Sequence, residues 1–395
     1  MAPSPPDAPL GLYIHIPFCA HICPYCDFNT YAGQESLIPR YVAAVERDIE
    51  RQGTELGGRA AATIFFGGGT PSLLPPEAIT RLVRACRAAF DLSPDAEITL
   101  EANPNSLDQA YLAGLREAGV NRLSIGVQTL HRRGLRVLGR MHEAADAEAA
   151  FRAARQAGFD NVSLDLIFGW PGQTLAGWEE DLERVLAWEP DHLSLYSLII
   201  EPGTPMADAV SRGILHPATD DEAADMYEAA IAMLERAGWV HYEVANWARR
   251  SPADVTSGSL PERASRHNVI YWRNGEYAAF GAGAHARIGD RRMMSHLLPA
   301  RYIEAIETEQ SPISNEERLT PEIAMGETMM LGLRLLCEGV DDSAFRVRHG
   351  VGLLERFGST IAELERLGLL QREDGRVRLT HRGLMVANDV CARFL

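Results

Sequence analysis

The 395-residue sequence contains no lysine, so all 38 of its fixed cations are arginines. This absence excludes any mechanism that needs a lysine Schiff base or a lysine general base. Acidic residues outnumber the arginines, and the formal net charge is −16. A balance of this sign argues against a general affinity for nucleic acid or for an anionic membrane surface, because both attract basic proteins.

The sequence also lacks long hydrophobic runs. None approaches the roughly 18 to 20 apolar residues that a helix needs to cross a bilayer. The opening stretch, MAPSPPDAPLG, is rich in proline and has neither a basic end nor an apolar segment, so it does not fit the pattern of a signal peptide. We therefore expect a cytoplasmic protein without stable membrane insertion, in which residues 1–10 form a disordered tail.

Cysteine is scarce, yet three of the six cysteines lie in one short stretch, FCAHICPYCDF: Cys19, Cys23 and Cys26. Disulfides are not expected, because no signal peptide is apparent. The C-x3-C-x2-C spacing lacks the second pair of thiols of most structural zinc sites, although His15 or His21 is near enough in sequence to complete one. Three thiolates can instead hold three corners of a cubane iron–sulfur cluster, which leaves the fourth iron open to a small ligand.

Six short β-rich runs follow one another, each leading into a turn and then a helical stretch: LYIHIPF, ATIFFGGGT, AEITLEANP, NRLSIGVQ, NVSLDLIF and HLSLYSLII. Strands that alternate with helices predict right-handed βαβ units and a parallel sheet, and hence an α/β fold. The unusual residues gather at the carboxyl ends of the strands. One site lined by six strand ends favours a partial (β/α)6 barrel over a doubly wound sheet.

The pattern changes after the sixth run. WVHYEVANWAR and EYAAFGAGAHARI predict additional strands or hairpins, and three helical stretches follow from about Thr320. A hairpin with Asp374 and Gly375 at its turn makes the end of the chain resemble a winged-helix module. We interpret it as a packing or lid domain, because its charges nearly balance. The predicted domains are 11–305, a barrel with extra strands that carry HNVIYW, and 306–395.

The cysteine spacing, with an aromatic residue before the third thiol, resembles the radical S-adenosylmethionine superfamily. This resemblance implies a [4Fe-4S] cluster held by Cys19, Cys23 and Cys26, with S-adenosylmethionine chelating the open iron through its amino and carboxylate groups. It also implies that an electron from the cluster cleaves the sulfonium of S-adenosylmethionine and yields a 5′-deoxyadenosyl radical.

Further segments resemble the S-adenosylmethionine pocket of the same superfamily. The glycines of FFGGGTPS allow a cofactor to approach the backbone closely. The resemblance implies that Arg140 pairs with the carboxylate of the cofactor and that Asp165 binds its ribose hydroxyls. The residues expected to contact the cofactor are Tyr13, Tyr25, Gly68, Gly69, Thr70, Glu101, Gln128, Arg140 and Asp165.

The segments YIHIPFC, GGGTPS, GVQ and LGRMH narrow the resemblance to the oxygen-independent coproporphyrinogen III oxidase family. The oxidases typically carry a fourth cysteine, in C-x3-C-x2-C-x-C, at the place of Phe28. The stretch HNVIYW resembles the H-N-x-x-Y-W signature of the haem chaperone branch of that family. That branch implies a protein that binds haem through His267 as an axial ligand and transfers it to haem-requiring acceptors, respiratory proteins among them.

The resemblance also implies that Tyr271 and Trp272 offer flat faces to a porphyrin, with Arg263, Arg266 and Arg273 as candidate partners for its propionates. Two enzymatic alternatives stay open. One is the anaerobic oxidative decarboxylation of coproporphyrinogen III, and the other is a radical reaction on a different substrate. No residue is assigned a catalytic role, and a homodimer is left open.

Overall fold

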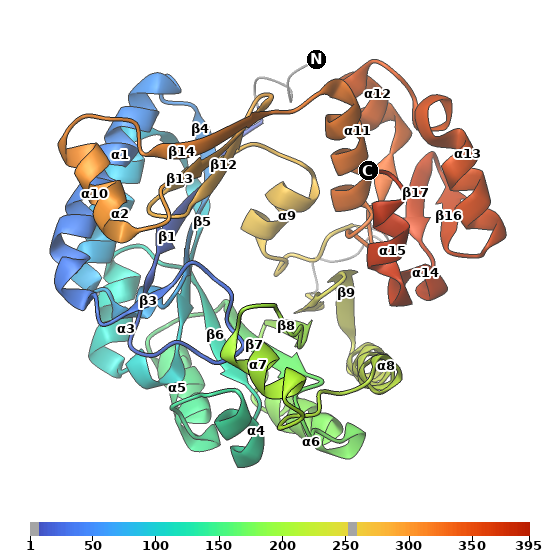
Figure 1. The fold of residues 1–395 in the computed structure, drawn as a ribbon, viewed down its shortest axis with the longest axis horizontal. Helices are drawn as coiled ribbons and strands as arrows, with labels where there is room; N and C mark the ends of the chain where they lie inside the picture. The colour runs from blue at the N-terminus through green and yellow to red at the C-terminus, as the bar shows by residue number, and fades with distance from the viewer. Residues whose placement is uncertain (1–7, 252–258) are drawn as a thin grey trace.

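The computed structural model describes residues 8–251 and 259–395. The chain forms a 12-stranded main sheet and a separate 3-stranded sheet near the C-terminus. In Figure 1, helices cover the outer face of the main sheet, and the C-terminal elements form a lobe beside it. Helix α9 (Arg266–Trp272) lies between the two parts. Most of the predicted tail lies outside the described residues, and its last residue, Leu10, already begins the first strand.

The six predicted strand–helix units form the centre of the main sheet, where their strands lie parallel and in chain order. The two outermost of these strands are not paired with each other, so the barrel is open, and the prediction of a partial (β/α)6 barrel is confirmed. The strands are β1 (Leu10–Ile16), β4 (Ala60–Gly68), β5 (Asp91–Ala102), β6 (Arg122–Gln128), β7 (Val162–Phe168) and β8 (His192–Ser197).

The helices between these strands turn an apolar face to the sheet. Helix α1 (Ile38–Glu55), for example, buries Val42, Val45 and Ile49, which recur at intervals of three and four. The other helices of this part are α2 (Pro76–Ala89), α3 (Gln109–Glu117), α4 (Arg132–Val137), α5 (Ala144–Gln156), α6 (Leu175–Leu186), α7 (Pro205–Ser211) and α8 (Asp220–Arg236).

Additional strands extend the sheet on both sides, as the sequence predicted. The strands β9 (Trp239–Glu243) and β10 (Asn246–Arg249) continue it beyond β8. On the other side, β11 pairs in parallel with β1, and the next three strands follow antiparallel. These elements are β11 (Tyr277–Phe280), β12 (His285–Ile288), β13 (Arg291–Ser295), α10 (Pro299–Glu307) and β14 (Ile313–Arg318).

The HNVIYW motif lies on helix α9, so its predicted placement on extra strands is wrong. The Ser265 side chain caps this helix by accepting the N–H of Asn268, and the first backbone N–H groups donate to the Glu97 carboxylate. A negatively charged hydrogen-bond acceptor at the start of a helix is favourable, because the first N–H groups have no partner within the helix. The partner comes from β5, far away in sequence, and no local pattern indicates it.

The C-terminal lobe has its own hydrophobic cluster, which includes Met329, Phe345 and Ile361. The predicted hairpin is present, with Asp374 at φ 51° and Gly375 at φ 75°, as a tight two-residue turn requires. The lobe contains α11 (Pro321–Gly332), β15 (Val340–Asp341), α12 (Asp342–His349), α13 (Leu353–Arg366), β16 (Leu370–Glu373), β17 (Arg376–Leu379), α14 (His381–Met385) and α15 (Ala387–Ala392).

Two details of this lobe were not predicted. Helix α12 buries a single apolar side chain, Phe345, so it lacks the apolar periodicity that would indicate a helix. The last helical stretch is divided at Val386, whose φ of −126° is not helical. The main sheet continues to Arg318, beyond the predicted boundary at 305 and 306, and the division into domains there stays a prediction. Within the described residues, no helix is both long and apolar enough to cross a lipid bilayer.

Candidate functional site

The three clustered cysteines lie at the carboxyl end of the first barrel strand. Cys19 ends the two-residue strand β2 (Phe18–Cys19), which pairs with β3 (Tyr31–Ala32), and Cys23 and Cys26 occupy the loop between them. The Thr70 amide donates to the Phe18 carbonyl at 2.8 Å. The start of the loop is therefore tied to the glycine-rich turn that follows β4.

The thiols are close enough to influence one another. Burial raises the pKa of Cys19 and of Cys26, and a neighbouring thiol adds to the rise in each case. The Thr70 hydroxyl, 3.5 Å from Cys19 Sγ, and the charge of Arg140 both oppose the rise in the pKa of Cys19, and Arg140 Nη1 lies 3.6 Å from Cys23 Sγ. Soft thiolates beside a guanidinium are a donor set that fits an iron–sulfur cluster.

His15 does not offer a free ring nitrogen as the fourth ligand of a zinc site. Its two ring nitrogens are engaged, Nδ1 with the Tyr13 hydroxyl at 2.9 Å and Nε2 with the Asn29 carbonyl at 3.0 Å. Within the described part of the chain, no group of three or more histidine, cysteine, aspartate or glutamate side chains is arranged to hold a metal ion. The fit of the three thiols to a cluster therefore depends on their chemistry and on their spacing in the sequence.

The glycine-rich turn passes directly over the cysteine loop. Gly68 adopts φ +111°, and a Cβ there would lie 2.5 Å from the His15 ring. At Gly69, a Cβ would lie 3.0 Å from Cys19 Sγ and 2.7 Å from the Phe18 carbonyl oxygen. Only glycine permits this approach, which leaves the backbone of the turn open to a bound group.

Arg140 connects three separate segments around the site. Besides Cys23, its guanidinium contacts the Asn103 side chain at 2.5 Å and the Gly126 carbonyl at 3.0 Å, both through Nη2. Asn103 in turn donates to Thr70 Oγ1 at 3.3 Å. Gln128, at the end of β6, is 9% exposed and adopts φ 66°. Sequence reasoning missed Asn103, although its position in EANP, two residues after Glu101, was a signal.

Two carboxylates belong to strands that are separated by β6: Glu101 lies near the end of β5, and Asp165 lies in the middle of β7. Glu101 Oε2 accepts the Gly68 amide at 3.1 Å, and Asp165 accepts hydrogen bonds from Ser124 at 2.8 Å and Ser163 at 3.1 Å. Removal from water raises the pKa of Glu101 to about 8, and the charge of Asp165 adds to this rise. Burial likewise raises the pKa of Asp165. The pair can therefore bind hydroxyl or ammonium groups that replace the lost water.

The raised pKa of Glu101 predicts a pH-dependent stability of the cofactor-free chain. The folded state keeps this proton up to about pH 8, while the unfolded chain releases it near 4.5. The stabilisation by the proton is therefore complete below pH 4.5 and is lost as the pH rises towards 8. The unmodified chain should lose up to about 3 kcal/mol in free energy of unfolding between pH 5 and pH 8, whereas Glu101→Gln, which cannot ionise, should lack this loss.

Urea unfolding at the two pH values measures this difference. The exposed Glu183 offers a control, because Glu183→Gln should follow the pH profile of the unmodified chain. Parallel profiles for the unmodified chain and Glu101→Gln would show that Glu101 is ionised in the folded state throughout.

The two predicted tyrosines pack in different surroundings. Tyr13, on β1, stacks with Phe65 at 6.3 Å between ring centroids. Tyr25 packs against a buried group that includes Leu138 and Trp170, near helix α4. Burial raises the pKa of both phenols, so they stay neutral.

His267 is a fully buried residue of α9, and its ring lies 6.4 Å from that of Tyr13 between centroids. Its Nδ1 is 2.7 Å from Thr63 Oγ1, and its Nε2 is 2.7 Å from the Tyr271 hydroxyl. The imidazole stacks with Phe65 at 5.1 Å. Burial, together with the charge of Arg122, lowers the pKa of His267 to about 3, so the ring is neutral. Tyr271 therefore covers the nitrogen that a metal would need.

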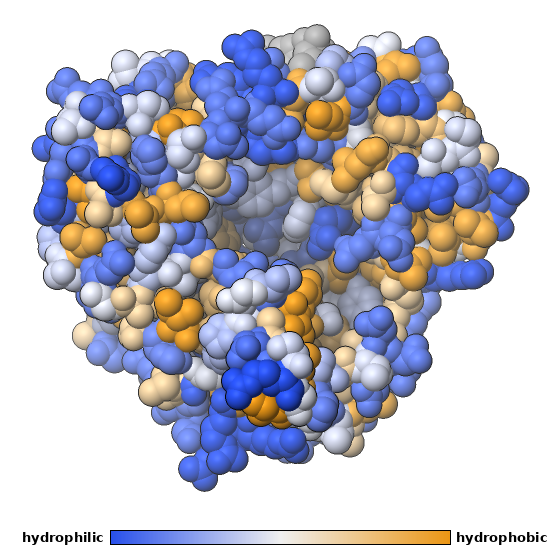
Figure 2. Space-filling view, in the orientation of Figure 1, coloured by the Kyte–Doolittle hydropathy of each residue, from blue (hydrophilic) through white to orange (hydrophobic). Residues whose placement is uncertain are grey.

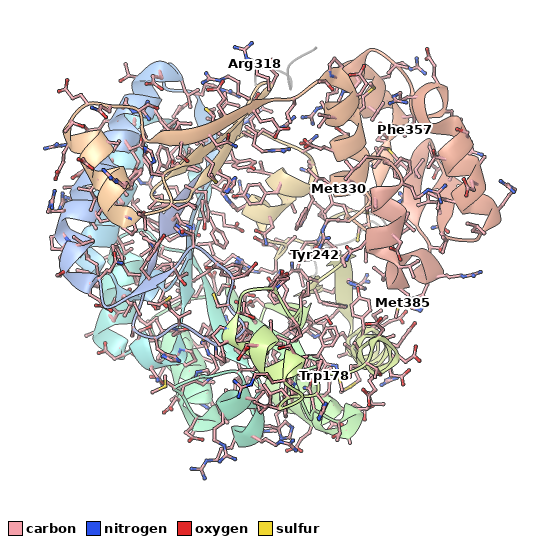
Figure 3. The ribbon with its side chains drawn as sticks, viewed as in Figure 1. Trp178, Tyr242, Arg318, Met330, Phe357 and Met385 are labelled. Carbon is pink, nitrogen blue, oxygen red and sulfur yellow. The ribbon has the colours of Figure 1, made fainter. Side chains whose placement is uncertain are left out.

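A large cavity opens on the other side of Tyr271. Its volume is about 720 Å³, within the usual range for a site that holds a cofactor-sized molecule. Its wall includes Tyr271, Trp272 and Phe28, together with Met330 from the C-terminal lobe, which Figure 3 labels. Figure 2 shows the molecule hollowed at the centre of this face, where Figure 1 places α9. Gly68 and Glu101 also line the cavity, so it is continuous with the S-adenosylmethionine residues.

The fold and the site define a member of the radical S-adenosylmethionine superfamily. The family model of that superfamily matches residues 13–185, and the HemN C-terminal domain model matches residues 319–386. The coproporphyrinogen III oxidase HemN from Escherichia coli, described as a radical SAM enzyme, shares the fold. Its structure matches with a TM-score of 0.82 and 24% identity, over 98% of this chain and 90% of that one.

The sequence comparisons narrow this class to one family. The heme chaperone HemW of Bacillus subtilis is 38% identical, over 97% of this chain and 98% of that protein. The heme chaperone HemW of Mycobacterium tuberculosis is 36% identical, over 100% of this chain and 97% of its own length. The chain therefore belongs to the HemW family, which confirms the predicted resemblance to the haem chaperone branch.

Proposed function

We propose that this protein is a haem chaperone, which binds haem and transfers it to acceptor haem proteins. The observation that carries the proposal is the cavity of about 720 Å³ whose wall includes Tyr271 and Trp272 of the HNVIYW motif. Aromatic faces at an enclosed wall suit a flat, largely apolar macrocycle. The full-length likeness to proteins named heme chaperone HemW supports the same reading.

The second part of the proposal concerns the cofactors. We infer that Cys19, Cys23 and Cys26 hold a [4Fe-4S] cluster and that the nine residues named for the S-adenosylmethionine pocket bind that cofactor. Bound there, the cluster would supply an electron and one open iron. Arg140 would face both the thiolates and the carboxylate of S-adenosylmethionine, so its charge offsets theirs. Glu101, neutral at pH 7 in the cofactor-free chain, can donate as well as accept a hydrogen bond.

The proposed role of His267 in haem binding needs a movement of Tyr271. Both ring nitrogens of His267 are hydrogen-bonded, one to Thr63 and one to Tyr271. Tyr271 lines the cavity, whereas His267 does not. Direct coordination of iron by Nε2 follows if the Tyr271 hydroxyl swings away. The neutral state of the imidazole suits a metal ligand, because a protonated ring nitrogen cannot bind iron.

A haem titration under anaerobic conditions tests the proposal. The reconstituted chain should bind one haem with a shift of the Soret band, and His267→Ala should bind it at least about tenfold more weakly, because its loss also unpairs the Thr63 and Tyr271 hydroxyls. His381→Ala, at an exposed histidine of the C-terminal lobe, is the control. No haem binding by the unmodified chain would overturn the function, and unchanged affinity in His267→Ala would remove this histidine from the site.

The remaining parts of the sequence-based interpretation stay predictions. They are the cytoplasmic location, the respiratory acceptors, a homodimer and the two enzymatic alternatives. Formation of protoporphyrinogen from coproporphyrinogen III, at the turnover of an enzyme, would favour the oxidase instead of the chaperone.

A further inference from the structure

One corner of the large cavity carries an excess of positive charge. Two guanidinium groups, from Arg287 on β12 and Arg348 on α12, converge on a single backbone oxygen. Arg287 Nη1 and Arg348 Nη2 each donate to the Asn274 carbonyl at 2.5 Å. Arg292 on β13 stands opposite Arg287 in the register of the two strands, and both side chains line the cavity. The segments that meet here come from the main sheet and from the C-terminal lobe.

Among the described residues, no carboxylate forms a direct ion pair with Arg287. Arg287 is only 5% exposed. In the described part of the chain, no carboxylate oxygen lies within 4.0 Å of its guanidinium nitrogens. The nearest acids already have cationic partners, since Glu276 pairs with Arg59 at 2.5 Å and Glu327 pairs with Arg292. A buried charge without a counter-ion is costly, and a bound anion would relieve that cost.

The electrostatic state of both arginines agrees with this reading. Burial lowers the pKa of Arg287, and the charge of Arg292 adds to this effect, although the charges of Glu327 and Glu276 oppose it. Burial and the charge of Arg287 lower the pKa of Arg348 to about 10. In a chain with a net charge of −16, a local cationic excess of this kind marks a place for an anion.

The other residues that line the cavity indicate which kind of molecule would carry the anionic group. Arg287 lies opposite Tyr277 of β11, whose ring makes an edge contact with the Tyr271 ring at 4.5 Å between centroids. Trp272 and Met330 add apolar surface on the side of α9 and α11. The cavity thus combines broad aromatic and aliphatic walls with one cationic corner, which fits a flat apolar molecule that bears a carboxylate.

We propose that Arg287 binds a carboxylate of the molecule held in this cavity, with Arg348 strengthening the positive field behind it. The inference rests on the proposed function, under which the carboxylate is a propionate of haem. Arg287 follows the HNVIYW motif at a distance and lies on a different element, so the motif does not indicate it. Of the arginines near the motif, Arg273 is paired with Glu338 at 2.6 Å and Arg266 donates to the Asp95 carbonyl at 2.7 Å.

The test compares haem with its dimethyl ester, in which both propionates are neutral, on the full reconstituted chain in one detergent buffer. We expect the unmodified chain to bind haem about 10- to 100-fold more tightly than the ester, because a charge-assisted pair is lost with the ester. Arg287→Met, which keeps the aliphatic stem, should bind haem as weakly as the unmodified chain binds the ester. Arg291→Met is the matched control, since Arg291 is exposed on β13 and pairs with Glu316.

The outcomes separate this inference from the function on which it rests. No haem binding by the unmodified chain overturns the chaperone proposal itself. Equal affinity of the unmodified chain for haem and its ester overturns the carboxylate site while leaving haem binding intact, and this arm needs no variant that has to fold. A preference for haem that survives in Arg287→Met also overturns it. A preference lost in Arg287→Met and kept in Arg291→Met supports it.

Discussion

Replacing Cys23 by alanine should leave the reconstituted chain with about a tenth or less of the iron and sulfide that a full [4Fe-4S] cluster contains. The variant keeps only Cys19 and Cys26 in this loop, and Arg140, 3.6 Å from the lost sulfur, then faces no thiolate. Two thiols and an uncompensated guanidinium are a poor site for a cubane. Iron and sulfide analysis with Mössbauer spectra, after reconstitution without oxygen, measures the effect.

Cys337→Ala is the matched control for this experiment. Cys337 is also a partly buried free thiol, but it lies against the His241 carbonyl at 3.8 Å, in another part of the molecule. Its variant should hold the full cluster. If Cys23→Ala retains the cluster of the unmodified chain, the three-thiol site is wrong, and the proposed binding of S-adenosylmethionine at an open iron loses its basis.

A single methyl group at Gly69 should have the second large effect. Gly69→Ala is expected to lower the free energy of unfolding by about 1–3 kcal/mol, the usual cost of overpacking. The added Cβ would lie 2.7 Å from the Phe18 carbonyl oxygen and 2.9 Å from that of Ile16. Both oxygens are backbone atoms, and they already accept the amides of Thr70 and Gly69 at 2.8 Å. The chain can relieve the clash only by breaking these hydrogen bonds between the glycine-rich turn and residues 16 and 18.

The same substitution should weaken binding of S-adenosylmethionine by more than about tenfold, because it separates the glycine-rich turn from Cys19 and its loop. Equilibrium unfolding of the cofactor-free chain and calorimetric titration of the reconstituted chain measure the two effects. Gly358→Ala is the control, since a Cβ at this position of α13 would meet nothing closer than 4.0 Å. Unmodified affinity in Gly69→Ala would mean that the turn takes no part in binding the cofactor.

Local patterns were sufficient for most of the barrel. A short β-rich run, followed by a stretch with apolar residues three and four apart, indicates each strand–helix unit. All six units could therefore be predicted. Helix α12 escaped because one buried side chain, Phe345, makes no periodic pattern. The HNVIYW segment was misplaced on strands because the residues that fix its helix, Glu97 above all, belong to a distant strand.

The same division holds for the candidate site. The cysteines, the glycines and the carboxylates Glu101 and Asp165 were indicated by spacing and by resemblance. The contact of Asn103 with Arg140 joins β5 to the turn before α5, and no spacing predicts it. The covering of His267 by Tyr271 and the pairing of Arg273 with Glu338 depend on how α9 packs. These contacts change which side chains are available to a ligand.

By itself, the sequence determined the order of the six strands, the C-x3-C-x2-C loop after the first of them and the absence of any lysine chemistry, because each is written in neighbouring residues. Tertiary structure alone decided that the Tyr271 hydroxyl covers Nε2 of His267 and that Arg287 and Arg348 share the Asn274 carbonyl. Burial and charge compensation depend on contacts between segments that are distant in sequence, and these contacts exist only in the folded chain.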